Sequence, residues 1–183
     1  MKKYIALLSF LLFALTKVAA QKVFVINIRQ EIDPQMSHFV DLGLKAATRD
    51  SADYIIIDMD TYGGALTDAD KIRTALLDYP KPVYVYINKN AASAGALISI
   101  ACDSIYMDRG SNIGSATVVD GEGKPAPDKY QSFMRAMMRS TAEVNNRNPD
   151  IAESMVGTVV GTDSITVGKV TAFTTSEAIA NHY

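Results

Sequence analysis

The 183-residue sequence contains no tryptophan, one cysteine and only two histidines. A single cysteine cannot form an intramolecular disulfide, so the fold depends on its hydrophobic core even in an oxidising compartment. Cys102 lies in the apolar segment 97–102, which favours a buried structural thiol. Because histidine and cysteine are scarce, and the acidic residues show no recognisable ligand spacing, we expect neither a metal site nor another cofactor.

The sequence also has no basic block, internal repeat or low-complexity segment. Its formal net charge is −2, and 21% of its residues are charged, which is ordinary for the surface of a globular domain. Such a charge pattern gives no indication of nucleic acid as a partner. The length fits one domain after any processing.

The first twenty residues differ from the rest. Lys2 and Lys3 precede a nearly unbroken apolar run over residues 4–15, and small residues then lead to Ala20. This layout is typical of a secretory signal peptide at residues 1–20 that is cleaved after Ala20; an uncleaved N-terminal anchor is the alternative. The run is shorter than the roughly 20 residues of a membrane span. We therefore predict an exported protein, periplasmic or outward-facing and membrane-associated.

Beyond residue 20, segments with the character of strands and helices alternate. Runs rich in apolar and β-branched residues predict strands at 22–28, 54–58, 82–87, 104–107, 116–119 and 165–173. Asp33 and Pro34 predict the start of a helix that reaches about residue 48, and further helices are expected at 67–77, 128–145 and from 174 onward. Repeated βα units predict an α/β fold with a mainly parallel sheet, right-handed crossovers and flanking helices. The uninterrupted apolar run at 54–58 indicates a strand covered on both faces.

The C-terminal half gives two further expectations. Apolar side chains recur at helical spacing between residues 128 and 145, and this pattern places Met134, Met137 and Met138 in the core; a contact between subunits is the alternative. The sequence stops at Tyr183, only a turn or two into the last predicted helix. We therefore expect residues 21–183 to be a single domain at the N-terminal end of a longer chain.

Two loops that follow predicted strands carry residues suited to catalysis. Gly63 and Gly64 are adjacent, so the backbone can turn its N–H groups into a cavity without a Cβ in the way, and such groups can hold an oxyanion; a plain tight turn is the alternative. Ser93 stands among small side chains in segment 91–96 at the start of a helix, as an accessible nucleophile or a simple helix cap. Because both loops follow parallel strands, they are expected to meet at the carboxyl end of the sheet.

A nucleophilic serine needs a base. His38 is expected on the first helix and His182 lies close to the end of the sequence, so neither is well placed to complete a triad. A surface or packing role is expected for both. A lysine can act instead if burial leaves its amine neutral. Lys124 and Lys129 lie in or after the loop before the long helix, and a solvated surface charge is the alternative for each.

Several short segments occur in a fixed order along nearly the whole mature chain: IDMDTYGG at 57–64, AASAGA at 91–96, ACDSIYM at 101–107, GSNIGSA at 110–116, and RN at 147–148 with IAE at 151–153. In this order they resemble the NfeD family of membrane-associated serine peptidases, which are related to the stomatin-partner proteases. The resemblance implies the Clp/crotonase fold, proteolysis by a Ser–Lys dyad and assembly into a homo-oligomer. It matches Ser93 to the family's nucleophile, and Gly63 and Gly64 to its oxyanion loop.

Two positions depart from the family's pattern. Proline usually precedes the diglycine, where this sequence has Tyr62, and this change is expected to reshape the substrate groove. The catalytic lysine of the archaeal members is matched by Arg139, which stays protonated and cannot act as a general base. Arg139 is instead expected to bind a carboxylate or to support an oligomer contact.

The resemblance also points to a different lysine. Bacterial sequences like this one often carry a lysine ten residues before the archaeal position, matched here by Lys129. Ten helical residues span about 15 Å, so Lys129 reaches the archaeal lysine's place only if the helix or loop shifts. Lys129 is therefore the predicted base, with Lys124, or no lysine at all, as alternatives.

The leading hypothesis is a serine endopeptidase in which Ser93 attacks the carbonyl and Lys129 accepts its proton. The oxyanion is held by backbone N–H groups near Gly63, Gly64 and Ala94. The resemblance implies apolar segments of membrane-associated proteins as substrates, with stomatin- or prohibitin-like partners. A second hypothesis is a weak or inactive domain that holds peptides as a scaffold in a membrane-protein quality-control complex. A third is acyl-CoA chemistry on a crotonase fold, against which export and the acidic charge both count.

Overall fold

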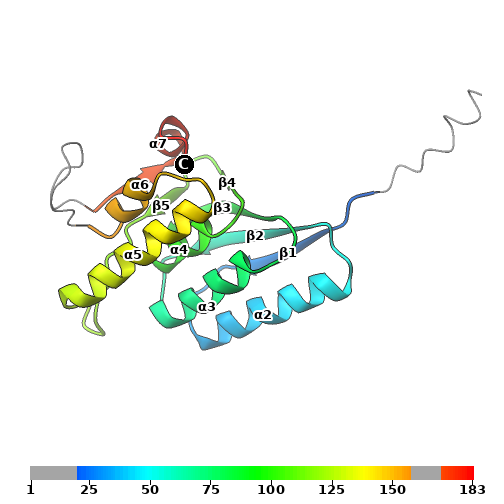
Figure 1. The fold of residues 1–183 in the computed structure, drawn as a ribbon, viewed down its shortest axis with the longest axis horizontal. Helices are drawn as coiled ribbons and strands as arrows, with labels where there is room; N and C mark the ends of the chain where they lie inside the picture. Colours follow the sequence, from blue (N-terminus) through cyan, green and yellow to red (C-terminus); the bar gives the residue numbers. More distant parts are fainter. Residues whose placement is uncertain (1–19, 158–169) are drawn as a thin grey trace, which may run out of the picture.

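The computed structural model describes residues 20–157 and 170–183 (Figure 1). The predicted signal peptide therefore lies outside the described residues, apart from Ala20, and so do residues 165–169 of the last predicted strand. The described strands are β1 (Val23–Ile28), β2 (Tyr54–Thr61), β3 (Val83–Ala92), β4 (Ser104–Met107), β5 (Asn112–Gly114) and β6 (Ala172–Thr174). The described helices are α2 (Pro34–Arg49), α3 (Leu66–Leu77), α4 (Ala94–Ile100), α5 (Asp128–Val144), α6 (Pro149–Ser154) and α7 (Thr175–Ala180).

The strands form one sheet in the order β1-β2-β3-β5-β6, and β4 also pairs with β3. The pairs among β1 to β5 are parallel, whereas β6 runs antiparallel to β5. Helices α2, α3, α4 and α5 lie along one side of the sheet, and β6 and α7 lie at the end farthest from β1 (Figure 1). The predicted α/β architecture with a mainly parallel sheet and flanking helices is confirmed.

Local sequence signals set the starts of two helices. The Asp33 side chain accepts a hydrogen bond of 2.7 Å from the Met36 N–H, and Pro34 occupies the first turn of α2, as predicted. Helix α6 was not predicted, yet it begins in the same way, with Asn148 as N-cap and Pro149 directly after it. Its six residues are too few to show a helical period, so the cap and the proline are its signals in the sequence.

The strand predicted at 116–119 is wrong. Strand β5 lies earlier in the chain, and the backbone of the predicted segment has other partners. The Ala116 N–H donates to the Met155 carbonyl at 2.6 Å, and the Val118 N–H donates to the Gln131 side chain at 3.0 Å. These β-forming residues are therefore held by α5 and by the end of α6, because tertiary contacts override strand propensity.

The prediction that residues 54–58 are covered on both faces is also wrong. Buried and partly exposed residues alternate along β2. Ile55 and Ile57 are fully buried on the face that the helices cover, whereas Ile56 points to the opposite face and stays partly exposed. In the part of the chain that the structure describes, helices thus cover one face of this strand.

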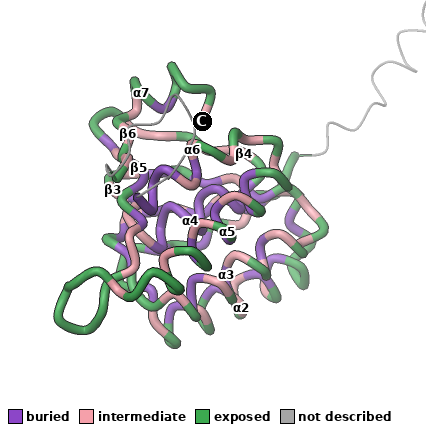
Figure 2. The backbone as a smooth tube through the Cα atoms, turned by 60° about the vertical axis from the view of Figure 1, so that its left-hand side comes forward, coloured by how far each residue is buried: buried purple, intermediate pink, exposed green. Residues whose placement is uncertain are grey.

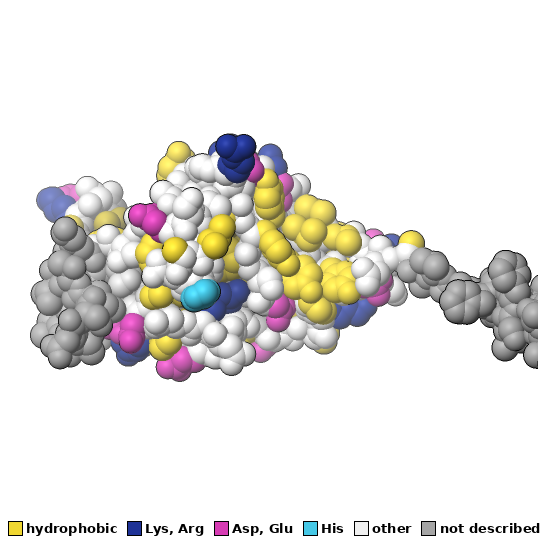
Figure 3. All heavy atoms as spheres, turned by 90° about the horizontal axis from the view of Figure 1, so that it is seen from above, with side chains coloured by type: hydrophobic (Ala, Val, Ile, Leu, Met, Phe, Trp, Pro, Cys, Tyr) yellow, Lys and Arg dark blue, Asp and Glu magenta, His cyan; other side chains and the backbone are white. Residues whose placement is uncertain are grey.

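The other face, the open sheet face, is lined by Val25, Ile56, Tyr84, Tyr86 and Tyr106 around a shallow apolar hollow of about 600 Å³. Tyr84 meets Tyr106 edge to face, with ring centroids 6.1 Å apart. Figure 3 shows hydrophobic side chains gathered on the surface beside the point where the described chain begins. Tyrosine rings, which combine an apolar body with a polar tip, stand where a second helical layer would otherwise lie, and Ile56 lies among them in the lining of the hollow.

The main core lies between the sheet and the helices. Helix α4 is buried along its whole length (Figure 2). The predicted burial of Cys102, and of Met134, Met137 and Met138 on α5, is confirmed. Burial raises the pKa of the Cys102 thiol to about 12, which fits a structural role because the reactive thiolate is strongly disfavoured.

The one-sided covering of the sheet predicts opposite outcomes for two adjacent residues of β1. Val25 is 51% exposed and Ile26 is 1% exposed. Val25→Asp is expected to lower the free energy of unfolding by about 1 kcal/mol or less. Ile26→Asp is expected to lower it by more than about 4 kcal/mol, because it buries an unpaired charge. Urea unfolding of both variants measures the difference, and equal losses would contradict an open sheet face.

Candidate active site

Ser93 occupies the junction between β3 and α4 in an unusual backbone conformation. Its φ of 54° and ψ of −118° lie in a region that costs a non-glycine residue about 1–3 kcal/mol. Its N–H donates to the Gly114 carbonyl at 2.9 Å, and its own carbonyl accepts from the Ala96 N–H at 3.0 Å. Its side chain makes no capping hydrogen bond to α4, so a simple helix cap does not explain this serine.

The diglycine turn packs directly against Ser93. A Cβ placed on Gly63 would lie 2.6 Å from Ser93 Cβ and 3.1 Å from Ser93 Oγ. A Cβ on Gly64 would lie 2.1 Å from the carbonyl oxygen of Ile32. Both glycines also have positive φ, 114° and 153°, so the turn requires glycine for conformation as well as for space. The two loops singled out in the sequence therefore meet at the carboxyl ends of β2 and β3.

Thr61 is a site residue that the sequence did not single out. It is 2% exposed, its hydroxyl donates to the Gln30 carbonyl at 2.6 Å, and it accepts the Gly63 N–H at 3.1 Å. The Gly63 N–H is thus engaged inside the turn. Gly64 and Ala94 line the same pocket as Ser93, and their N–H groups make none of the turn and cap hydrogen bonds of the described residues, so these two can serve as donors for a negatively charged oxygen.

Ser93 opens into a small apolar pocket. The pocket has a volume of about 170 Å³, and it is lined by Gly64, Ala65, Leu66, Ser93, Ala94, Ala116, Thr117, Val118, Val119 and Met134. Met134 comes from α5, whereas Val118 and Val119 belong to the hairpin that precedes α5. Because most of these side chains are aliphatic, the pocket fits one apolar side chain of a bound ligand.

A second cavity adjoins the first at Gly64, on the other side of the diglycine turn. It has a volume of about 440 Å³ and is lined by Arg29, Gln30, Glu31, Asp60, Thr61, Tyr62, Gly63 and Gly64. Arg29 pairs with Asp58, and this hydrogen bond raises the pKa of the Arg29 guanidinium. Tyr62, in the place where the family usually has proline, is 82% exposed. The site thus joins a pocket lined mostly by aliphatic side chains to a cavity lined mostly by polar and charged ones.

The two candidate lysines lie outside the lining of the Ser93 pocket. Lys129 Nζ lies 4.8 Å from the centroid of the Tyr130 ring, and Lys124 Nζ pairs with Glu122 Oε2 at 2.7 Å. Both lysines are exposed. The described conformation therefore brings Ser93, Gly63, Gly64 and Ala94 together without a base among them.

Lys124 belongs to a hairpin that borders the pocket. The Asp120 N–H donates to the Lys124 carbonyl at 2.8 Å, and the Ala126 N–H donates to the Val118 carbonyl at 2.9 Å. The Gln131 side chain closes the base of this hairpin with bonds to both backbone groups of Val118. Movement of this hairpin would therefore change both the pocket wall and the position of the lysines.

Arg139 has a partner within its own chain. Its Nη1 lies 2.6 Å from Glu153 Oε2, and the Glu153 side chain is only 15% exposed. The pair joins α5 to α6, so the expectation that Arg139 binds a carboxylate is met inside the domain. His38 and His182 are both exposed, and the described residues contain no group of side chains arranged to hold a metal ion.

The contact between Gly63 and Ser93 predicts a sharp effect of one added methyl group. Gly63→Ala is expected to lower the free energy of unfolding by about 1–3 kcal/mol, because it adds both a clash and an unfavourable φ. Gly121→Ala is the matched control, since nothing lies within 4 Å of a Cβ at that exposed loop position. Thermal unfolding of both variants provides the measurement, and a Gly63→Ala protein as stable as Gly121→Ala would contradict the contact.

Comparison with known proteins gives one family match and curated relatives. A family model described as NfeD1b, N-terminal domain, matches residues 22–183. Membrane protein NfeD1b of Bacillus subtilis (strain 168) is 38% identical over 139 residues, which cover 76% of this chain and 32% of that protein. Membrane-bound protease PH1510 of Pyrococcus horikoshii is 28% identical over 165 residues, which cover 85% of this chain and 37% of that protein. The chain thus spans about a third of the length of these relatives.

Solved structures give the fold. The 1510-N membrane-bound stomatin-specific protease, as a lysine-to-alanine mutant in complex with a substrate peptide, superposes with a TM-score of 0.76 at 27% identity, covering 90% of this chain and 74% of its own. ClpP1 from Listeria monocytogenes superposes with a TM-score of 0.63 at 18% identity, covering 86% of both chains. The predicted Clp/crotonase fold is confirmed. Within the described residues, every helix is too short or too polar to cross a membrane.

Proposed function

Because the chain belongs to the NfeD1b N-terminal domain family, we propose that it is a serine peptidase domain with Ser93 as its nucleophile. One observation carries the proposal. Ser93 is held in a strained conformation against Gly63, at the mouth of an apolar pocket and without a capping role. Strained backbone at a serine between a strand and a helix is a common property of nucleophiles in hydrolases. The relationship to a membrane-bound protease supports the same class of reaction.

The reaction begins with attack of Ser93 Oγ on the carbonyl carbon of the scissile peptide bond, while a base takes the hydroxyl proton. The N–H groups of Gly64 and Ala94 hold the negative oxygen that forms. The C–N bond then breaks, the base returns the proton to the leaving amine, and an ester joins the substrate to Ser93. Attack by water on this ester releases the acid and restores the serine.

The base in this proposal is Lys129, with Lys124 as the alternative. A lysine accepts a proton only when it is neutral, which requires a desolvated position. Both amines are exposed and occupied elsewhere, so the proposal requires the hairpin before α5 to rearrange when a peptide fills the cleft. Catalytic contacts that form only in the substrate complex are common in hydrolases.

The proposed substrates are apolar segments of membrane-associated proteins, including stomatin- or prohibitin-like partners. The aliphatic lining of the Ser93 pocket favours an apolar side chain next to the scissile bond. A solved relative is described as stomatin-specific and as bound to a substrate peptide. Export and association with a membrane as a homo-oligomer belong to the same proposal.

A catalytically inactive scaffold that holds peptides is a second candidate function. It is favoured by the position of Lys124 and Lys129 outside the pocket and by the pairing of Arg139 with Glu153. The same cleft would then bind an apolar peptide without cleaving it.

Covalent labelling with a fluorophosphonate probe separates these two functions. The wild type is expected to react with the probe, and Ser93→Ala is expected not to react. Lys129→Met is expected to slow the reaction at least about a hundredfold, the usual contribution of a general base, whereas Lys124→Met is expected to react normally. Equal labelling of the wild type and Ser93→Ala would reject the serine. Peptide binding without labelling or turnover would support the scaffold.

Tyr62 is expected to act on substrate binding. An aromatic ring that is 82% exposed beside the diglycine turn can stack on a peptide without supporting the fold. Tyr62→Ala is expected to raise KM at least about threefold, in line with the loss of one aromatic contact, with kcat and thermal stability nearly unchanged. Phe39→Ala is the control, because Phe39 is also exposed, at 49%, but lies on α2. Peptide-cleavage kinetics give the comparison, and identical KM values would contradict a role for Tyr62.

A further inference from the structure

Next to the site, β2 and β3 lose their regular pairing. The register is continuous as far as Met59 opposite Ile87, and it resumes with Thr61 opposite Ala91. Two steps along β2 thus correspond to four along β3, so the extra residues lie within 88–90 of β3. A bulge of this kind bends the strand and leaves backbone groups without their regular partners.

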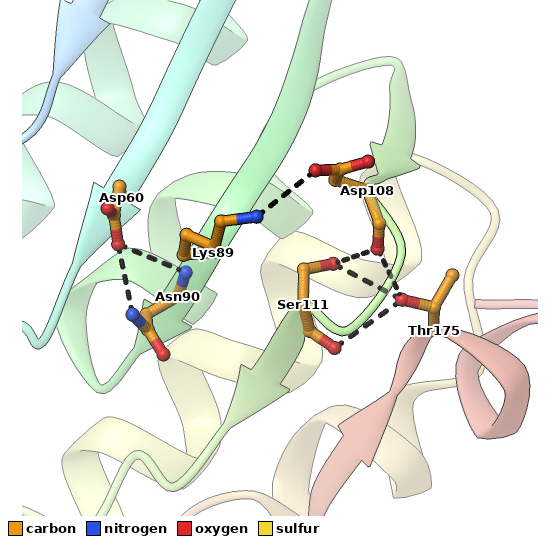
Figure 4. A network of polar contacts seen from close by, with 6 residues as sticks. All are labelled: Asp60, Lys89, Asn90, Asp108, Ser111 and Thr175. Atoms are coloured by element: carbon orange, nitrogen blue, oxygen red, sulfur yellow. Dashed lines mark hydrogen bonds and ion pairs between the residues drawn. The ribbon is translucent and has the colours of Figure 1, made fainter.

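Asn90 lies in this bulge and bonds to both neighbouring strands. Its backbone N–H and its side-chain Nδ2 donate to Asp60 Oδ1, at 3.2 and 3.0 Å. Its side-chain Oδ1 accepts a hydrogen bond from Asn112 Nδ2 at 3.0 Å. Side chains from β2, β3 and β5 thus form one series of hydrogen bonds, the Asp60–Asn90–Asn112 ladder, whose Asp60–Asn90 part is seen in Figure 4.

Each member of the ladder stands two or three residues before a backbone part of the site. Asp60 leads into the diglycine turn, and Asn90 stands three residues before Ser93. Asn112 stands two residues before Gly114, whose carbonyl accepts the Ser93 N–H at 2.9 Å. The ladder therefore joins β2, β3 and β5 close to their carboxyl ends, just before each chain segment enters the cleft.

We propose that the Asp60–Asn90–Asn112 ladder positions Ser93 against the diglycine turn, with Asp60 as its anchor. The proposal rests on Ser93 as the nucleophile. One carboxylate oxygen of Asp60 accepts two donors of Asn90, and hydrogen bonds to a charged acceptor are the stronger kind. Without this acceptor, both partly buried donors of Asn90 lose their partner. The bulge then relaxes, and Ser93 leaves the strained conformation in which it faces Gly63.

Lys89, the charged residue of the bulge, makes a weaker contact than Asn90 does. It neighbours Asn90, but its side chain extends to the other side, toward Asp108 (Figure 4). Lys89 Nζ lies 3.3 Å from Asp108 Oδ2, and the two side chains are 55% and 38% exposed. The Asp108 carbonyl in turn accepts hydrogen bonds from the hydroxyls of Ser111 and Thr175, at 2.8 and 2.7 Å. The contacts of Lys89 therefore lead to α7 and away from Ser93. Exposed ion pairs contribute little, so Lys89 is not an anchor of the site.

The test measures fluorophosphonate labelling of the full-length chain over a range of probe concentrations, which separates probe binding from bond formation. Asp60→Ala and Asn90→Ala are expected to slow the maximal labelling rate at least about tenfold, because a misplaced nucleophile loses its near-attack geometry. The probe concentration for half-maximal rate is expected to change little. Asp60→Asn keeps an acceptor oxygen and is expected to restore the rate to within about threefold of wild type, as a hydrogen-bonding role requires.

The matched control is Asp103, whose carboxylate binds the opposite end of β3 from Asn90. Asp103 Oδ2 accepts the Val83 N–H at 2.7 Å, so Asp103→Ala also removes a carboxylate acceptor of a β3 backbone donor. Asp103→Ala and Lys89→Ala are expected to label at the wild-type rate. Thermal unfolding of every variant provides the correction for the folded fraction.

Two outcomes would overturn the positioning role. One is that folded Asp60→Ala and Asn90→Ala label at the maximal rate of the wild type. Ser93 would then remain the nucleophile, but the ladder would have no positioning role. The other is an equal slowing by Asp103→Ala, which reduces the effect to general destabilisation. If the wild type itself does not label, the proposed peptidase function fails, and amide hydrogen exchange tests the ladder alone. Asn90→Ala is then expected to speed exchange at 60–65 and 88–96, whereas Asp103→Ala is not, and equal patterns would overturn the ladder.

Discussion

The contact between Ser93 and Gly63 leaves no room for another side chain between β2 and β3 at their carboxyl ends. A Cβ on Gly63 would lie 2.6 Å from Ser93 Cβ, and the next glycine is equally confined by the carbonyl of Ile32. The turn is therefore fixed between Ser93, at the end of β3, and the segment that follows β1. This arrangement requires Ser93 to adopt a positive φ, which is maintained because its N–H is bound to Gly114. The geometry of the cleft thus depends on a close approach that only glycine permits.

The packing of α5 explains why, among the described residues, the cleft has an apolar wall and neither candidate lysine lies in it. Arg139 is joined to Glu153 on α6, and Met137 and Met138 are buried in the core, so the middle of the helix is fixed. Met134 is then the residue of α5 that lines the pocket. The lysines precede this fixed part, at the hairpin and in the first turn. A conformational change that brings Lys129 to Ser93 would therefore start in the hairpin, where Gln131 supplies the connecting hydrogen bonds, and not in the helix.

Local patterns in the sequence were sufficient for most of the fold. Asp33 with Pro34 marked the start of α2 correctly, since capping involves residues three apart. The diglycine and the small-residue segment around Ser93 were recognisable because each follows an apolar strand. The patterns failed where the partner is distant. Residues 116–119 have strand character, but their backbone groups bind α5 and the end of α6. The apolar run at 54–58 predicts a covering layer on both faces, whereas tyrosines from other strands line its outer face.

The sequence by itself determined which chemical groups stand at each loop, namely a serine among small residues, a pair of glycines, and lysines in place of histidines. It also determined the alternation of strands and helices that brings the ends of parallel strands to one edge. Only the tertiary structure decided how these groups meet. It placed Lys124 and Lys129 outside the pocket, and it engaged the Gly63 N–H with Thr61. It also joined Asp60 to Asn90 and Asn90 to Asn112 across 30 and 22 residues of sequence. The physical reason is that caps and periods arise between near neighbours in the chain, whereas pocket walls and hydrogen bonds across strands depend on how distant segments pack.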